Sequence, residues 1–458
     1  SSAASDVYKR QRSNRVILTS MIERQDFKSR YPFTACVGIS LSTEAFSSLP
    51  TRAYLVKGLL VKIPHNATVR NDGSLSFNGS FNGSLKTGKY WTTCPVCIFF
   101  DMLTNDKHGA GDFVTASNIS WVDLYPLAQY ANKRINTPDG LEPRFAINTV
   151  IAAQNDAYKV LQNLASTFRG MTYWAANTVN VGADHGNLDG SDVNPVHLYN
   201  NANVIGGVFN YSGTSLKTRS TSIRVRYNDP ENLYKPNVVV VEDYDLITKY
   251  GYQVKDLVAF GCSSKYQAQR LGTWMLKSEE LDADVVIFKT GLDGLAVLPS
   301  QVFAVADEMR QGVQRAGRIA SGATTTSIVL DKDLSSVLSS NPTSFTLNCT
   351  LPDGTVESKT ISAVSGTTVT VSAFSSAPQS QSVYTITSSS LQHQKFRCID
   401  VIDNNDSTYT IEGVQFNDSI YAAADTNSEL AYTDITFFDA RPSVPTNLQH
   451  SVIVVNTP

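Results

Sequence analysis

The chain has 458 residues, of which 42% are hydrophobic and 17% are charged, and its formal net charge at pH 7 is −3. This composition is typical of a globular protein with sizeable cores and roughly two to four domains. Lysine and arginine are scattered along the sequence, which argues against a nucleic-acid-binding surface. No apolar run approaches the roughly 20 residues of a membrane-spanning helix.

The first 64 residues combine an unusual start with strand patterns. Residues 1–11, SSAASDVYKRQ, lack apolar periodicity and resemble translated sequencing-adapter read-through. We therefore expect a non-native leader joined to the middle of a longer protein. Apolar runs and alternation predict strands at 15–22, 35–41 and 53–63.

A turn-rich stretch at 71–88 precedes two predicted helices. It holds FNGS twice, at 77–80 and 81–84, and Asn-Gly is a strong signal for a two-residue hairpin turn. Pro95 suits the first turn of a helix, because its missing N–H does no harm there, and apolar residues follow it at helical spacing. A second helix is predicted at 121–131.

The clearest helix of the chain follows a strand predicted at 145–151. Asn155 is the expected N-cap, and the apolar residues after it fall at i, i+3, i+4, i+7 and i+11. Arg169 suits the negative end of the helix dipole, and Gly170 is placed to serve as the C-cap. A strand is predicted directly afterwards, at 171–175.

Strands and one helix alternate through residues 223–307. The helix opens at Ser264, where Ser264 and Gln267 have the spacing of a capping box. The strands are predicted at 223–227, 238–241, 284–289 and 302–305, with a Gly-Leu-Asp-Gly turn at 291–294.

Between residues 324 and 386 the charge falls and serine and threonine dominate. We interpret this stretch as a small all-β insert. Its short β runs are predicted at 327–330, 344–351, 367–371 and 382–386. Strands at 396–401 and 409–416 are expected to rejoin the preceding domain.

Several of these segments resemble one family, in the family's own order. The strings FGCSSKYQAQRLGTWMLKSEE, FKTGLDGLAVLPSQVFAVAD and RAGRIA are similar to the tail-tip attachment proteins (protein J family) of lambda-like siphophages, also called central tail fibre or tail hub proteins. So are SLPTRAYLVKGLLVKIP, CPVCIFFDMLTNDKHGAGD and AYKVLQNLASTFRGMTYWA. The resemblance covers residues 14–440. The family's Pro-Gly-Asp before the last strand is here Pro299-Ser300-Gln301, so we expect a different turn there.

The resemblance implies an α+β, β-rich, multi-domain tail hub in which tube-like β-domains carry packed helices. It implies a virion protein, not an enzyme, that closes the tail tube as a homotrimer and carries the central fibre used for host attachment. The implied partners are other tail-tip and tail-tube proteins, with the host receptor bound by a C-terminal region absent from this chain. The implied location is the phage tail tip, after synthesis in the bacterial host cytoplasm.

The pattern and the resemblance together predict six segments. PSVPTNLQHSVIVV near the end resembles the opening of a fibronectin type III module. The segments are the leader at 1–11, a β-rich hub domain at 12–120, an α+β hub domain at 121–222, a second tube-like hub domain at 223–321 plus 389–440, the β insert at 322–388, and a truncated fibronectin type III start at 441–458.

Cys94-Pro95-Val96-Cys97 is the sharpest enzyme-like signal, because a Cys-x-x-Cys pair at a helix N-terminus can hold a thiolate. A redox site would also need a thioredoxin-type βαβ setting, and a zinc site would need a second Cys/His pair at short spacing. Neither is apparent in the sequence. We therefore expect buried thiols in a reduced, intracellular chain.

Two acidic clusters are candidates for acid–base catalysis or calcium binding. The first is Glu242, Asp243 and Asp245 after a predicted strand, where solvated or helix-capping charges are the commoner outcome. The second lies in a loop rich in glycine and asparagine and lacks the spacing of a calcium-binding loop; it comprises Asp184, His185, Asp189 and Asp192. The sequence predicts no catalytic, cofactor or metal site.

Two alternatives to a phage tail hub remain open. A phage-tail-like bacteriocin would use the same hub and cannot be separated by sequence. A secreted glycan-active enzyme with a fibronectin type III tail is a different class, and it would need a carboxylate pair about 5–10 Å apart facing a cleft.

Overall fold

The computed structural model describes residues 48, 54–151, 157–175, 178–213, 219–282, 284–311, 316–388 and 393–426. The chain divides into two units, Ser1–Leu55 and Val56–Pro458, and every element described below lies in the second. Several predictions lie outside the described residues: the leader at 1–11, the strands at 15–22 and 35–41, the N-cap at Asn155, and the fibronectin type III start at 441–458.

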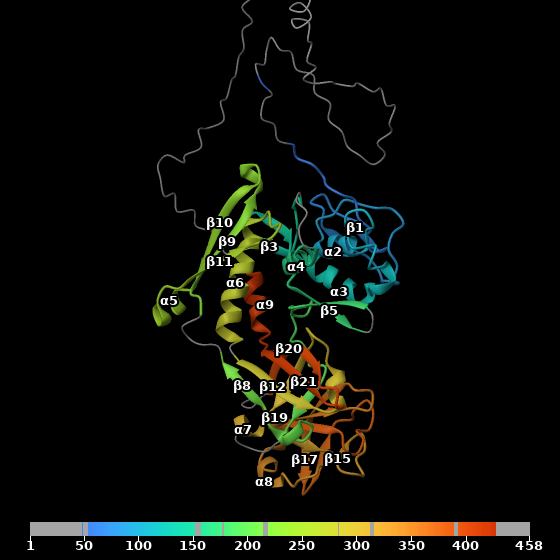
Figure 1. Cartoon of the computed structure of the whole chain (residues 1–458). Helices are drawn as coiled ribbons and strands as arrows, with labels where there is room; N and C mark the ends of the chain where they lie inside the picture. Colours follow the sequence, from blue (N-terminus) through green and yellow to red (C-terminus); the bar gives the residue numbers. More distant parts are fainter. Residues whose placement is uncertain are drawn as a thin grey trace, which may run out of the picture. The chain divides into compact units, whose positions relative to one another are not determined.

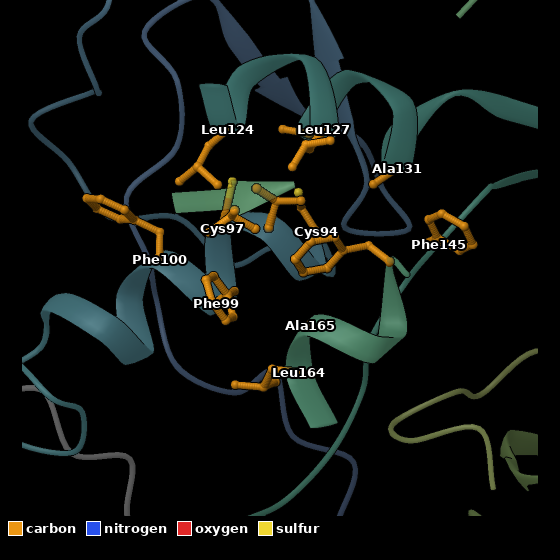
Figure 2. Packing of buried hydrophobic residues seen from close by; sticks show 14 of the residues in the cluster. Cys94, Cys97, Phe99, Phe100, Leu124, Leu127, Ala131, Phe145, Leu164 and Ala165 are labelled. Carbon is orange, nitrogen blue, oxygen red and sulfur yellow. The ribbon is translucent and has the colours of Figure 1, made fainter. Parts of the chain in front are cut away.

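Three helices share one apolar core in the first part of the second unit. Figure 2 shows Phe99 of the first helix near Leu164 of the third, with Leu124 of the second on the other side of the cluster. Fully burying such a side chain contributes about 1.5–3 kcal/mol relative to exposure. The helices are α2 (Pro95–Thr104), α3 (Trp121–Asn132) and α4 (Ala157–Thr167), with the hairpins β1 (Ala67–Val69) to β2 (Leu75–Phe77), β3 (Arg134–Thr137) to β4 (Gly140–Pro143), and β5 (Gly170–Ala175) to β6 (Thr178–Ala183).

The strand predicted at 53–63 is wrong. Its described part, residues 54–63, forms no strand; among the described residues its backbone meets the segment 86–90 only through an isolated bridge between Val61 and Tyr90 and a bond from the Lys86 amide to the Ile63 carbonyl. The FNGS repeats do not form the turn of the first hairpin, which uses Gly73 at a φ of 81°; only Phe77 of the first repeat belongs to it, as the end of β2.

The strand predicted at 145–151 is also wrong. Its backbone amides are used by separate elements, so no neighbouring strand can pair with it. The Ile147 amide donates to the Thr93 carbonyl at 3.0 Å, and the Asn148 amide donates to the Gly261 carbonyl at 2.8 Å.

The end of α4 differs from the prediction by one residue. Arg169 is the left-handed residue, with a φ of 57°, and Gly170 begins β5 instead of capping the helix. Glycine at 170 is required for space, because a Cβ there would lie 2.4 Å from the Phe168 ring.

A three-stranded sheet follows, with α6 on one face (Figure 1). Gly272 lets the helix approach closely, since a Cβ there would lie 2.7 Å from Val241. Ser264 caps α6 by accepting from the Gln267 amide at 3.2 Å, but the Gln267 side chain bonds Ala146 instead of closing the predicted capping box. The strand order is β10 (Lys235–Glu242), β9 (Ser222–Asp229), β11 (Val254–Val258); the helices are α5 (Tyr244–Tyr250) and α6 (Lys265–Leu281).

The next part of the fold is a six-stranded sheet with an aromatic core. It contains all four strands predicted at 284–289, 302–305, 396–401 and 409–416. Tyr199, Phe288, Phe303 and Phe396 are each almost fully buried in that core. The strand order is β7 (Leu198–Asn200), β13 (Val302–Ala306), β20 (Gln394–Asp403), β21 (Tyr409–Gln415), β12 (Asp284–Thr290), β8 (Asn210–Gly213). Two helices flank it: α7 (Glu308–Gln311) and α9 (Ser419–Asp425), the latter packed along α6.

The turn before β13 keeps a backbone conformation that glycine favours. Ser300 stands where the family has glycine, and its φ of 77° lies in the left-handed region. The turn therefore keeps the conformation that glycine would adopt most easily, although the residue is serine. Gly182 makes room for it, because a Cβ on Gly182 would lie 1.8 Å from the Ser300 hydroxyl oxygen.

A second six-stranded sheet is built entirely from residues 316–388, and it has its own apolar core. The four predicted β runs are present, but β17 was missed because polar residues interrupt its apolar pattern. The sheet also starts before the predicted boundary at 322. Its strand order is β14 (Ala316–Arg318), β19 (Val383–Ser388), β16 (Phe345–Thr350), β17 (Val356–Ser365), β18 (Thr368–Val371), β15 (Ser327–Val329), and α8 (Ser335–Leu338) lies in the same segment.

The fold is thus β-rich α+β, as predicted. Within the described ranges, no helix combines the length and apolar character that crossing a membrane would require.

Candidate functional site

A cavity of about 670 Å³ lies beside α6. One face of α6 forms a wall of it through Leu271, Trp274 and Met275, which recur at helical spacing. The other walls come from β5, from residues 257–260 and from the strands β20 and β21. Cavities of this size, largely apolar with a few polar groups, are where small ligands bind.

Arg397 of β20 connects four parts of the fold at the edge of this cavity. Its Nε lies 3.1 Å from Asp184 Oδ1, and its Nη2 donates to the Tyr421 hydroxyl at 3.1 Å. The same guanidinium donates to the carbonyls of Ala183 and His185, at 3.1 and 2.9 Å. Burial opposes the charged form, but Tyr421 and Asp184 outweigh it, so the pKa of Arg397 is raised.

Asp184 is fully occupied by donors in this network. The Trp274 indole nitrogen donates to Asp184 Oδ2 at 3.1 Å, and the Tyr421 hydroxyl donates to Asp184 Oδ1. Because Arg397 also pairs with it, Asp184 is a structural acceptor and lacks the freedom of a nucleophile or general base.

Arg144 fixes the end of α9 from the opposite side. Its Nε donates to Asp425 Oδ1 at 3.1 Å, and its guanidinium lies 3.8 Å from the centre of the Tyr130 ring. α9 is therefore held by Arg397 through Tyr421 and by Arg144 through Asp425.

Arg169 is a buried cation of a different kind. Only 8% of it is exposed, its Nε has no hydrogen-bond partner, and it forms no ion pair with any described residue. It lies 4.6 Å from the Trp274 ring centre and 5.3 Å from that of Phe145. Burial lowers the pKa of Arg169.

Asp282 lies at the C-terminal end of α6 and also lines the cavity. Its Oδ1 has no partner among the described residues. Burial, with a contribution from the negative charge of Asp184, raises the pKa of Asp282 to about 8. The carboxyl group is therefore mostly protonated at pH 7, and it can donate a hydrogen bond.

The predicted thiol pair is in the core of the helical part, not in the cavity. Cys94 and Cys97 are completely buried, and Figure 2 shows both sulfur atoms inside the apolar cluster. The Asn132 amide donates to Cys94 Sγ at 3.1 Å. A hydrogen bond to Cys94, reinforced by burial, raises the pKa of Cys97 well above its ordinary value. The described cysteines are all free and buried, as expected.

The first acidic cluster caps and braces secondary structure. Asp243 is the N-cap of α5, accepting from the amides of Asp245 and Leu246 at 3.1 and 3.2 Å, and it pairs with Lys277 at 2.9 Å. Glu242 accepts from the Tyr252 hydroxyl at 3.0 Å. These are the helix-capping charges favoured from the sequence.

The second acidic cluster does not assemble into a site. Asp189 accepts from the Ser191 amide and hydroxyl, while Asp184 turns toward Arg397. His185 Nδ1 lies 2.7 Å from the Gly186 carbonyl oxygen. In the part of the chain that the structure describes, no three histidine, cysteine or acidic side chains group to hold a metal.

Sequence reasoning did not assign Arg169, Trp274, Asp282 or Arg397 to a cavity, nor Tyr421 to the network around Arg397. The sequence signal that could have identified this site is Arg397. A charged residue between the apolar residues Phe396 and Cys398 is typical of a buried ion pair. Nothing local marks Asp282, whose environment depends on Asp184, far away in sequence.

Comparison with known proteins places the chain among phage tail proteins. A family model described as "Putative phage tail protein" matches residues 156–321. The chain is 31% identical to tip attachment protein J of Escherichia phage SECphi4 over 426 residues, which is 91% of this chain and 36% of that protein. It is 28% identical over 426 residues to tip attachment protein J of Escherichia phage SECphi27, covering 90% and 34%. The chain thus spans about a third of the length of these curated relatives.

Solved structures match more weakly. A chain from the virion of the native gene transfer agent particle has 10% identity and a TM-score of 0.34, covering 63% of this chain and 44% of that chain. The tail protein from Neisseria meningitidis MC58 has 11% identity and a TM-score of 0.30, covering 63% and 62%. TM-scores this low do not establish a shared fold. By sequence, the chain is a relative of tip attachment protein J of lambda-like phages, and the resemblance identified from its sequence motifs is confirmed.

Proposed function

We propose that the chain is a structural part of a phage tail tip, within a longer tip attachment protein located in the virion. The observation that carries the proposal is 31% identity to tip attachment protein J over 91% of the chain. The buried ion pairs around α9 fit a rigid building block, because they hold distant segments together through charge-assisted hydrogen bonds.

The test is to interrupt the gene in the phage that encodes this chain and to supply the intact gene from a plasmid. We expect particles without functional tips that fail to adsorb, and adsorption restored by the plasmid. Normal tails and normal adsorption without the gene would contradict the proposal. Attachment to the host receptor is proposed for the whole protein, through regions beyond this chain.

We also propose that the protein assembles as a hub-forming homotrimer with other tail proteins. The sheet face opposite α6 exposes Val238 and Val240, at 46% each, and Val258, at 74%. β10 pairs only with β9 among the described strands, so its outer edge is open and requires a cover. The segment 54–63, which forms no strand, also exposes apolar side chains, namely Val56, Leu59 and Leu60.

The domain division remains part of this proposal, including a fibronectin type III start at 441–458 and a separate β insert. The insert would begin at Ala316, because β14 completes its sheet. A phage-tail-like bacteriocin would use the same hub, and the genes next to this one would separate the two origins.

We further propose that the chain is not an enzyme. The glycan-active alternative needs two carboxylates facing one cleft. Asp184 and Asp282 do line one cavity, but Asp184 is engaged by Arg397, Trp274 and Tyr421. Purified chain should release no reducing sugar from bacterial surface polysaccharides; release that Asp282→Asn abolishes would revive the enzyme alternative.

A further inference from the structure

The cavity beside α6 has largely apolar walls and two buried arginines, Arg169 and Arg397, of which Arg397 is paired with Asp184. Leu271, Met275 and Phe260 line it together with Ile399 and Val414. The α6 residues facing it run from Gln267 to Asp282, a length of helix of about 22 Å at 1.5 Å per residue. The apolar part of the lining thus follows α6 over several turns, which suits a ligand with an extended hydrocarbon body.

Arg169 supplies a positive charge in this cavity that feels the carboxylates of Asp184 and Asp425 but forms no direct ion pair with a described residue. A buried charge without a partner costs several kcal/mol, and the cation–π contacts with Trp274 and Phe145 offset only part of that cost. A guanidinium is suited to bind a carboxylate through two parallel hydrogen bonds. A ligand with one anionic head would give Arg169 the partner that the described residues do not provide.

The negative groups in the lining do not oppose such a ligand. Asp184 is paired with Arg397, and Glu279 is paired with Lys255 at 2.7 Å while accepting from the Ser220 amide. Asp282 is mostly protonated at pH 7, as described above. Arg169 therefore remains a buried guanidinium in the lining that forms no ion pair with a described residue.

We propose that the cavity beside α6 binds a fatty-acid-like ligand, with its carboxylate on Arg169 and its hydrocarbon chain along Leu271 and Met275. The charge at Arg169 determines the head group, and the apolar walls determine the body. Ligand binding is a separate claim from the tail-tip role, so it can fail while the proposed function stands.

The test is isothermal titration calorimetry of the purified chain with dodecanoate, dodecanol and dodecyltrimethylammonium, all below their aggregation concentrations. We expect dodecanoate to bind at least tenfold more tightly than the neutral and cationic analogues. Arg169→Met should remove that preference, and Arg169→Lys should keep part of it. The control Arg224→Met changes an exposed arginine that pairs with Asp256, and it should bind dodecanoate as the parent chain does.

Met275→Trp narrows the cavity without touching Arg169, so the proposal stays testable if Arg169→Met does not fold. We expect this variant to lose dodecanoate binding at least tenfold while its circular dichroism spectrum is unchanged. The proposal is overturned if dodecanoate does not bind, or if dodecanol binds equally well. It is also overturned if folded Arg169→Met or folded Met275→Trp binds dodecanoate as tightly as the parent chain.

Discussion

At the scale of single residues, the buried ion pairs around α9 determine how strongly α9 is attached to the segments that pack against it. The Arg397 guanidinium pairs with Asp184 and donates to the Tyr421 hydroxyl and to three backbone carbonyls, those of Ala183, His185 and Ser300. These partners come from β6, the loop after β6, the turn before β13 and α9. A buried pair of this kind is costly to break, because the partner left behind is an uncompensated charge.

Arg397→Met should therefore destabilise the fold by about 3–5 kcal/mol, measured by urea denaturation. Asp184→Asn should cost less, because it can keep part of the hydrogen bonding, and the double variant should lose less than the sum of the two. The control is Arg224→Met, whose pair with Asp256 is half exposed and should contribute less than about 1 kcal/mol. Equal losses for Arg397→Met and the control would contradict this account.

Asp282 makes stability depend on pH. Its pKa is about 8 in the folded chain against an ordinary value of 3.8, so the folded state holds a proton that the unfolded state releases. Stability contributed by this group is present below about pH 4 and is lost as the pH rises toward 8.

Asp282→Asn should hence leave stability nearly unchanged at pH 3 and increase it by at least about 1 kcal/mol at pH 8.5. The matched control is the exposed Asp256→Asn, which should show no such pH-dependent gain. Denaturation curves at the two pH values measure the difference. A gain of the same size at both pH values would rule out the raised pKa as its cause.

At the scale of elements, the β insert is attached at one place on its host sheet. Val305 of β13 and Gln394 of β20 are direct cross-strand partners, so the chain leaves and returns at neighbouring positions. The insert has its own core, and it touches the host through a small cluster that includes Ala304 and Val383.

Replacing residues 316–388 with a short Gly/Ser linker should leave the rest of the chain folded. Loop closure costs little when the two ends are already adjacent. We expect an unchanged near-ultraviolet circular dichroism signal from the host aromatic core and a small loss of stability from the exposed contact cluster. Global unfolding would show that the insert belongs to the main core.

Local periodicity was sufficient to predict α2, α3, α6 and the strands of the aromatic sheet, because each buries a regular apolar face. It failed where the backbone partners are scattered. Residues 145–151 bond Thr93, Gly261 and Gln267, and no spacing within the segment encodes those contacts. The cavity was missed for the same reason, since Arg169, Asp282 and Arg397 meet only through tertiary packing.

At the scale of the whole molecule, the exposed valines Val238, Val240 and Val258 of the β10-β9-β11 sheet, beside Arg224 and Arg226 on the same face, point to assembly. The protein should form a trimer, measured by light scattering at micromolar concentration. Changing both Val238 and Val240 to lysine should convert it to a monomer, because the two lysines would be buried and uncompensated at the interface. Val122→Lys, at a residue that is 68% exposed on α3, is the matched control and should stay trimeric. A strictly monomeric parent at high micromolar concentration would contradict the trimer.

The central claim is that this chain is part of a tail tip. Electron microscopy of intact phage particles, labelled with gold-conjugated antibodies raised against the purified chain, tests it most directly. The account predicts gold only at the tail end distant from the capsid, and label lost from particles whose gene is interrupted. Label on the capsid, label along the tail shaft, or particles without the protein would contradict it.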